Sequence, residues 1–306
     1  MAMLLRFLSY LKAYPAVLVV MFGAMLGSLA GGLTTPRVLS LVVDRGIGQG
    51  SMPAVLRYTG LLALVALARA GMRYAQAYSQ ELLGQKVIHR LRHDLYQRLL
   101  RLSFGYYTMH ATGDEMSKLT SDLYAVMDFV GFGVAEMVSS LLVFIGTATA
   151  LLLTDWRLAL VVMSPIPVLM FFAFRFSGIV GPLWERIREE MGKLTTALQE
   201  NVSGVRVVKS FSREPHEIAK FGARNQANLA AHMSRATVEA RTFPALNLIS
   251  GFCFILLFWY GGRRVYAGQL SLGNFFAFNW YLWGLIWPVR FLGFLIGITR
   301  QALAAG

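Results

Sequence analysis

Apolar residues are gathered into six long runs along the chain, each long enough or nearly long enough to cross a membrane. A membrane-spanning helix needs about 20 predominantly apolar residues, because the hydrocarbon layer is about 30 Å thick. The third and fourth runs are separated only by Thr154-Asp-Trp-Arg157, which predicts a tight hairpin at one face of the membrane. The six runs are residues 15–36, 53–72, 130–153, 158–180, 243–262 and 272–298.

Two longer polar segments, between runs two and three and between runs four and five, contain 13 of the 16 acidic residues. Leu91, Leu95 and Leu99 recur four residues apart in the first segment, which indicates a helix. No proline interrupts residues 54–103, so run two is predicted to continue as one helix. Such a helix would be about 75 Å long, far more than the thickness of a bilayer. We therefore expect two helical hairpins to project beyond the membrane.

Each projecting hairpin has a predicted break at its tip. In "ATGDEMSKLTSD", residues 111–122, Thr112 and Glu115 have the capping-box spacing that begins a short helix. In "FSREPHEIAKF", Pro215 has a favourable position in the first turn of a new helix. The expected spans, with their extensions, are approximately residues 14–43, 53–106, 120–153, 157–208, 216–262 and 272–302 of one transmembrane domain, residues 1–306.

The distribution of basic residues predicts the orientation. The N-terminus has a charged start and a long apolar run without a clean cleavage site, so residues 1–13 are expected to form an interfacial elbow helix. If the N-terminus lies on the cytoplasmic side, 19 Lys and Arg residues lie on that inner side and six lie on the outer side. This asymmetry favours both termini in the cytoplasm. The six outer residues, of which the last two run against the trend, are Arg37, Arg45, Arg57, Arg157, Arg263 and Arg264.

Composition supports a membrane protein. The 306 residues are 56% hydrophobic and 15% charged, against about 25% charged residues in soluble domains. A positive cytoplasmic side explains the net charge of +13 without a nucleic-acid partner, which we do not expect. The single cysteine, Cys253, lies in an apolar run, so no disulfide framework or metal cluster is predicted.

No catalytic motif is recognisable in the sequence. The phosphate-binding pattern G-x-x-x-x-G-K-[ST] does not occur, and "GGRRVYAG" lacks its lysine and hydroxyl. His89 and His93 have the spacing of a metal pair, but the sequence offers no third ligand, so we interpret them as solvated residues on a helix surface. No catalytic or metal-binding residue is predicted.

Ionisable residues within the apolar runs are the candidates for a substrate cavity, because charges inside a membrane are costly. The arginines are expected either to extend to lipid headgroups or to form a basic vestibule that opens inward, with Glu136 paired to one of them. Arg69 lies one turn deeper than Arg73 and is the best single candidate. The aromatic residues of "FFAFNWYLWGLIW" could line the same chamber or pack between helices. The candidate cavity residues are Arg69, Arg73, Glu136, Arg175 and Arg290.

Four stretches carry a family resemblance: "GQKVIHRLRHDLYQRLLRLSFGYY", "TGDEMSKLTSDLYAV", "LQENVSGVRVVKSFSREPHEIAKF" and "GQLSLGNFFAF". In their order and spacing they resemble the transmembrane domain of type I ATP-binding-cassette exporters, the bacterial lipid and multidrug exporter family. The resemblance implies an all-α membrane fold of six long helices with two cytoplasmic hairpin extensions. It also implies a coupling helix at each tip, near residues 112–119 and 209–217, that docks on a nucleotide-binding domain. The implied coupling residues are Thr112, Gly113, Asp114, Glu115, Met116, Phe211, Ser212, Arg213 and Glu214.

The resemblance further implies the partners. We expect a nucleotide-binding domain, on further residues of the same polypeptide or on another one, because the sequence stops at Gly306. ATP and Mg²⁺ would bind there, and no cofactor is expected in this chain. A second transmembrane domain, identical or not, and membrane lipids are the other expected partners, in the inner (plasma) membrane.

Three functions compete at this point. The leading hypothesis is the membrane half of an exporter that moves a hydrophobic or amphipathic, drug-like or lipid-like substrate by alternating access. A stand-alone secondary transporter or channel is the alternative, which paired buried acids and broken half-helices would favour. Glu136 is the one acid within the six apolar runs. A membrane enzyme would need a catalytic constellation that the sequence does not contain.

Overall fold

The computed structural model describes residues 10, 12–103, 105 and 123–305, and these residues form helices joined by short turns, without a strand. Most of the expected elbow helix 1–13 and the whole first coupling helix 112–119 lie outside the described residues. The chain divides into two compact units, which are described separately. Unit 1 comprises residues 1–167 and 250–306, and unit 2 comprises residues 168–249.

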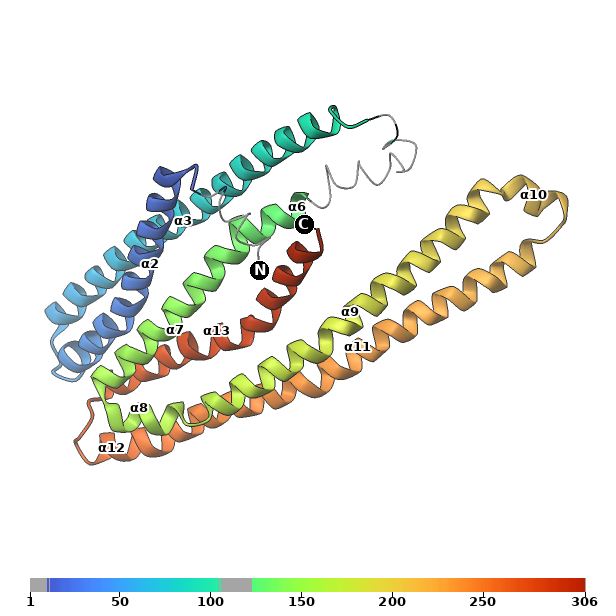
Figure 1. Ribbon diagram of the computed structural model, residues 1–306. Coiled ribbons are helices and arrows are strands. Elements are labelled where there is room, and N and C mark those ends of the chain that lie inside the picture. Colours follow the sequence, from blue (N-terminus) through green and yellow to red (C-terminus); the bar gives the residue numbers. More distant parts are fainter. Residues whose placement is uncertain (1–9, 11, 104, 106–122, 306) are drawn as a thin grey trace. The chain divides into compact units, whose positions relative to one another are not determined.

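Unit 1 is a bundle of long helices (Figure 1). Helix α2 packs against both α3 and α13, and α13 also packs against α7. The turns that follow η1, α7 and α12 lie at one end of the bundle, which we call the loop end (Figure 1). The elements of unit 1 are α2 (Pro15–Leu41), η1 (Val42–Ile47), α3 (Met52–Leu99), α6 (Leu123–Asp128), η3 (Phe129–Gly133), α7 (Val134–Thr154), α8 (Trp156–Met163), η4 (Leu257–Gly261), α12 (Gly262–Tyr266) and α13 (Leu272–Ala305).

Glycines allow α2 and α3 to approach each other closely. A Cβ atom on Gly27 would lie 3.0 Å from the sulfur of Met72, and one on Gly31 would lie 3.2 Å from the Cβ of Arg69. The two glycines are four residues apart and therefore lie on one face of α2. Small residues at this spacing are a common means of packing helices in membranes. The α2–α3 hairpin is thus a closely packed pair.

Large apolar side chains from helices distant in sequence form the core of unit 1. Phe278, Leu282 and Leu285 line one face of α13 at spacings of four and three residues and are fully buried. Leu151 and Leu158, which flank the tight turn between α7 and α8, are buried as well. Another cluster of buried residues joins α2, α3 and α7: Met21, Leu83, Val87 and Ala135.

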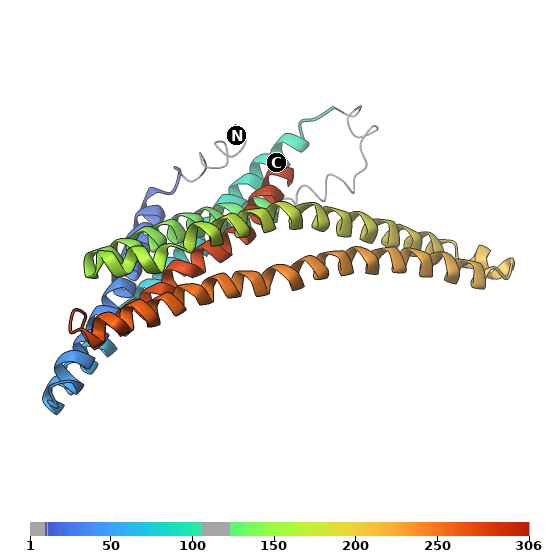
Figure 2. The same cartoon turned by 90° about the horizontal axis from the view of Figure 1, so that it is seen from below.

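Unit 2 is an antiparallel hairpin of two long helices, with a short helix, α10, at its tip (Figures 1 and 2). Cross-helix contacts keep one register along its length: Phe176 with Phe243, Trp184 with Arg235, Met191 with Asn228, and Glu200 with Lys220. Its elements are the greater parts of α9 (Ile166–Ser203) and α11 (Glu214–Leu256), with α10 (Val205–Ser210) between them.

Five helical segments of the described part are long and apolar enough to cross a membrane. The sixth predicted run lies on α13. The expected all-α membrane fold is therefore confirmed. Helix α3 is unbroken over 48 residues, in keeping with its lack of an internal proline. The five segments are Pro15–Ile47, Met52–Leu99, Gly131–Thr154, Trp156–Ser203 and Glu214–Tyr266.

The fourth predicted span, residues 157–208, contains three helical elements, α8, α9 and α10. It is interrupted at Ser164 and Pro165, between α8 and α9, because a proline has no amide hydrogen and its ring clashes with the carbonyl four residues earlier. It is interrupted again at Gly204. The third and fifth predicted spans are also composite, since each contains a five-residue π-helical segment, η3 or η4.

The short helix at the tip of unit 2 begins and ends earlier than the expected coupling helix 209–217. Helix α10 covers Val205–Ser210, and α11 begins at Glu214, with Pro215 in its first turn as predicted. Ser212 has a φ of 50°, in the left-handed region. The amide of Arg213 donates to the Val208 carbonyl (3.0 Å) and that of Ser212 to the Lys209 carbonyl (3.2 Å). These two bonds form a Schellman motif, which ends α10 before residue 211.

Candidate functional site

A cavity of about 380 Å³ lies within unit 1, between α2, α3, α7 and α13. Its wall is mainly apolar, with a small number of polar groups, as is usual for a small-molecule site. The residues that line it are Met25, Ser28, Leu29, Gly32, Leu33, Arg69, Arg73, Gln76, Ser139, Leu142, Val143, Thr147, Trp280, Tyr281, Trp283 and Gly284.

Helix α3 contributes the charged side of the cavity. Arg69, Arg73 and Gln76 are spaced by four and three residues, so they lie on one face of the helix. Arg69 is about 25 Å along α3 from Met52, at 1.5 Å per residue. The Arg69 guanidinium lies beside Gly32, where a Cβ atom would be 3.5 Å away, an ordinary van der Waals contact. Two positive charges and one amide thus face the same space.

The five candidate cavity residues predicted from sequence are not all in the wall. Arg69 and Arg73 line the cavity, and Glu136, half-buried in the first turn of α7, is electrostatically attracted by Arg73. Arg290 is half-buried on α13 and does not belong to the lining residues. Arg175 is exposed on α9 in unit 2. The part of the chain that the structure describes therefore gathers three of the five residues at or beside one cavity.

Helix α13 contributes aromatic residues to the cavity wall. Trp280 and Trp283 line it and remain partly exposed, and Trp283 packs against Phe254 with ring centroids 5.1 Å apart. The Tyr281 hydroxyl donates to the Leu33 carbonyl at 2.5 Å and joins α13 to α2. Flat apolar rings opposite two guanidinium groups form a wall with separate apolar and cationic sides.

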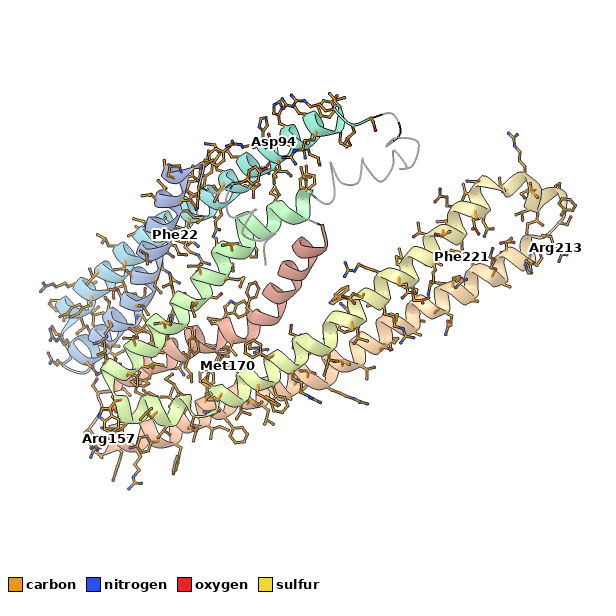
Figure 3. The ribbon with its side chains drawn as sticks, in the orientation of Figure 1. Phe22, Asp94, Arg157, Met170, Arg213 and Phe221 are labelled. Atoms are coloured by element: carbon orange, nitrogen blue, oxygen red, sulfur yellow. The ribbon has the colours of Figure 1, made fainter. Side chains whose placement is uncertain are left out.

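The tip of unit 2 presents exposed apolar side chains next to charged ones. Phe211 is 73% exposed, and Val207 and Ile218 are also exposed. Arg213 lies at the same tip (Figure 3), and Lys209 pairs with Glu214 at 3.9 Å. Of the nine implied coupling residues, Phe211 to Glu214 are therefore at a solvent-accessible turn. The other five, Thr112 to Met116, lie outside the described residues.

Two ion pairs lie on α9, within this hairpin. Lys193 contacts Glu189 at 2.8 Å and Glu190 at 2.9 Å. The hydrogen bond from Lys193, together with its charge, lowers the pKa of Glu189, and the hydrogen bonds to both carboxylates raise the pKa of Lys193. Exposed pairs of this kind contribute little to stability, so this stretch is best regarded as a solvated surface.

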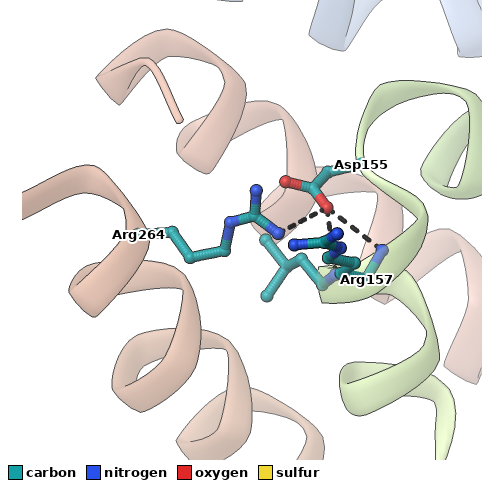
Figure 4. Close-up of polar contacts among 4 residues, drawn as sticks. Asp155, Arg157 and Arg264 are labelled. Atoms are coloured by element: carbon teal, nitrogen blue, oxygen red, sulfur yellow. Dashed lines mark hydrogen bonds and ion pairs between the residues drawn. The ribbon is translucent and has the colours of Figure 1, made fainter. Parts of the chain in front are cut away.

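An ion pair at the loop end, between Asp155 and Arg264, was missed by sequence reasoning (Figure 4). The two side chains are 9% and 14% exposed, and the Arg264 Nη1 donates to the Asp155 Oδ1 at 3.0 Å. The same oxygen accepts from the amides of Arg157 and Leu158, each at 3.1 Å, and so caps α8. Because Asp155 neutralises Arg264, this arginine no longer counts against the excess of basic residues predicted for the inner side. An aspartate directly before a helical pattern was an available signal for the cap.

A second carboxylate, Asp44, also anchors the loop end. Its Oδ1 accepts from the Gly273 amide in the first turn of α13 at 2.7 Å. The two residues are separated by 229 positions in sequence, and no local pattern pointed to their contact. Among the described residues, no group of three or more His, Cys, Asp or Glu could hold a metal ion.

The fold and the cavity define a multi-pass membrane protein with a mainly apolar cavity between its helices. Residues 17–289 match the family model of the ABC transporter transmembrane region. The chain belongs to this family, and the recognition of an ABC exporter transmembrane domain from its sequence motifs is confirmed.

Three relatives illustrate the similarity. The chain is 32% identical to the uncharacterized ABC transporter ATP-binding protein YknU of Bacillus subtilis, over 98% of this chain and 52% of that protein. It is 27% identical to the ATP-dependent lipid A-core flippase of Syntrophus aciditrophicus, over 95% of this chain and 48% of that protein. It is also 27% identical to the multidrug resistance-like ATP-binding protein MdlA of Escherichia coli, over 89% of this chain and 47% of that protein. The chain spans about half the length of these relatives.

Proposed function

We propose that this chain is the membrane-spanning half of an ATP-driven exporter that works by alternating access. The observation that carries the proposal is the cavity of unit 1, enclosed by four long helices of an ABC transporter transmembrane region. The relatives' names support the energy source, since all three refer to ATP. In this proposal ATP and Mg²⁺ bind to a nucleotide-binding domain, on further residues of the same polypeptide or on another one, because the P-loop pattern does not occur in these 306 residues.

The proposed orientation places both termini in the cytoplasm and the loop end outside, in the inner (plasma) membrane. The excess of basic residues on the inner side supports it. A second transmembrane domain completes the assembly. Exposed apolar side chains of unit 2, among them Trp184, Leu198 and Met233, support a partner, since a helix that projects into water would otherwise leave them solvated.

The proposed substrate is an amphipathic, lipid-like or drug-like molecule with an anionic group. Arg69 and Arg73 are suited to bind the anionic group, and guanidinium groups bind carboxylates and phosphates well. Trp280 and Trp283 are suited to hold the apolar part. The names of the flippase and of the multidrug resistance-like protein support a substrate of this general kind.

Transport by the protein together with its nucleotide-binding domain tests this function. In proteoliposomes, we expect export of an anionic amphipath that stops when ATP is omitted. Phe211→Ala is expected to reduce the number of molecules exported per ATP hydrolysed about fivefold, which corresponds to the ~1 kcal/mol that marks an energetically important residue of a docking surface. Gln226→Ala, at an exposed polar position on α11, is the control and is expected to leave this ratio unchanged. Export that persists without ATP would favour a stand-alone secondary transporter or channel instead.

A further inference from the structure

Two of the residues in the cavity wall are glycines that precede a proline by about one helical turn. Gly32 on α2 is followed by Pro36, and Gly284 on α13 is followed by Pro288, each four positions later. In a regular α-helix, the carbonyl of one residue accepts a hydrogen bond from the amide of the fourth residue after it. Proline has no amide hydrogen, so neither glycine carbonyl receives this bond. We call these two groups the freed carbonyls.

The freed carbonyls are accessible from the cavity. A glycine has no side chain, so Gly32 and Gly284 contribute only backbone atoms to the wall. The ring of a proline also presses against the carbonyl four residues earlier, which bends the helix and tilts that carbonyl outward. Pro36 and Pro288 are themselves buried and do not belong to the lining residues. A ligand in the cavity therefore meets the freed carbonyls directly.

Hydroxyl groups of the protein bond to neighbouring carbonyls instead. The Gly31 carbonyl accepts the Thr35 hydroxyl at 2.8 Å, and the Leu33 carbonyl accepts the Tyr281 hydroxyl at 2.5 Å. Within the described part of the chain, no side chain donates to either freed carbonyl. A carbonyl without a donor in a mainly apolar wall is unfavourable, so the cavity favours a ligand that supplies a donor.

Both freed carbonyls lie near one junction of α2 and α13. Gly32 directly precedes Leu33, which accepts the bond from Tyr281. Gly284 lies three residues beyond Tyr281, about 4.5 Å along the helix axis. The Nη2 of Arg69 lies 3.5 Å from the position of a Cβ atom on Gly32. A head group bound at this junction can therefore reach a guanidinium and a freed carbonyl together.

The charges of the cavity select the kind of donor. Arg69 and Arg73 both line the wall, so they repel a ligand that donates through an ammonium group. A hydroxyl group donates without a charge, while an anionic group of the same ligand pairs with the guanidinium groups. The best match is therefore a hydroxyl close to an anion.

We propose that the cavity selects anionic amphipaths that have a hydroxyl group close to the anion, and that the carbonyls of Gly32 and Gly284 accept hydrogen bonds from such hydroxyls. Pro36 and Pro288 are then specificity-determining residues that do not touch the ligand. The inference rests on the proposed function and narrows its substrate class.

Three ligands test the preference in the unmodified chain, held in lipid nanodiscs. They are an alkanesulfonate, its derivative with a hydroxyl on the second carbon from the sulfur, and the methyl ether of that derivative. A bromine on each alkyl chain quenches Trp280 and Trp283 in the cavity wall and so reports binding. The hydroxylated sulfonate should bind about fivefold more tightly than the other two, the effect of one hydrogen bond between uncharged groups. Equal affinity of the hydroxylated and parent sulfonates would overturn the proposal.

Pro36→Ala/Pro288→Ala tests the carbonyls themselves. Alanine restores the amide hydrogens, so both glycine carbonyls take up their helical bonds and no longer accept from a ligand. The preference for the hydroxylated over the parent sulfonate should disappear, while affinity for the parent, which has no donor, should change by less than about twofold. If the double variant does not fold, the single variants decide, since at least one of them should lose the preference.

Pro182→Ala is the matched control. Pro182 follows Gly178 by the same four positions on α9, but neither residue lines the cavity, and both belong to unit 2. This variant should keep the preference of about fivefold for the hydroxylated sulfonate. A preference that persists in the proline variants of the cavity, or that disappears equally in Pro182→Ala, would overturn the assignment of the freed carbonyls. Failure of ATP-driven export alone would contradict only the proposed function, because the binding test uses no nucleotide.

Discussion

Arg264→Asp is expected to destabilise the loop end of unit 1 by about 3–5 kcal/mol, the typical cost of breaking a buried ion pair. The substitution places two carboxylates where Asp155 and Arg264 now meet at 3.0 Å with little exposure to solvent. Arg263→Asp is the matched control, since Arg263 is the exposed neighbour on the same short helix. A surface substitution of this kind should change the free energy of unfolding by no more than about 0.5 kcal/mol.

Thermal unfolding in detergent can be followed by a dye that reacts with Cys253 when the bundle opens, because this thiol is buried. The exchange variant Asp155→Arg/Arg264→Asp should recover part of the loss, since the charges again attract. The exchange variant should remain about 1 kcal/mol less stable than the unmodified protein, because an arginine at position 155 cannot cap α8. Equal transition temperatures for Arg263→Asp and Arg264→Asp would show that the pair does not stabilise the loop end.

The second large effect is expected at the cationic side of the cavity. Arg69→Ala/Arg73→Ala should weaken binding of an anionic amphipath by about ten- to a hundredfold, because each hydrogen bond to a charged group contributes roughly 1.5–3 kcal/mol and solvent screens part of it. Quenching of Trp280 and Trp283, which line the cavity, reports binding to this domain directly. A cationic amphipath with the same alkyl chain should bind at least as well to the variant as to the unmodified protein.

Arg290→Ala is the control for this experiment, since Arg290 lies on α13 outside the cavity wall. We expect its affinity for the anionic amphipath to remain within about twofold of the unmodified protein, as for a charge screened by solvent. A similar loss for anionic and cationic ligands in the double variant would contradict the assignment of the arginines to charge recognition. A larger loss of affinity for the anionic amphipath in Arg290→Ala than in the double variant would place the binding site outside this cavity.

The fold was predictable because its signals are local. The six apolar runs, the short polar link at 154–157 and the first-turn position of Pro215 are each visible within a short stretch of sequence. The break before α9 also had a local signal, Pro165. The position of α10 was harder to predict, because the Schellman motif that ends it uses Ser212 where glycine is usual.

The contacts that complete the site were not predictable, since they join residues far apart in sequence. Tyr281 donates to Leu33 across 248 positions, and Gly273 donates to Asp44 across 229. Neither glycine nor tyrosine in an apolar run indicates such a partner. The charges within the runs gave a better signal, because an arginine in a membrane span needs a polar environment. That signal identified Arg69 and Arg73 but did not separate them from Arg175 and Arg290.

Alternating access of the cavity is the central claim, and the accessibility of Ser139→Cys in the protein with its nucleotide-binding domain tests it most directly. Labelling by an impermeant maleimide is measured separately from each side of the membrane, first without nucleotide and then with ATP trapped by vanadate. We predict that the thiol reacts from the inner side without nucleotide and from the outer side in the trapped state. Reaction from the same side in both states, with ATP hydrolysis intact, would contradict the account.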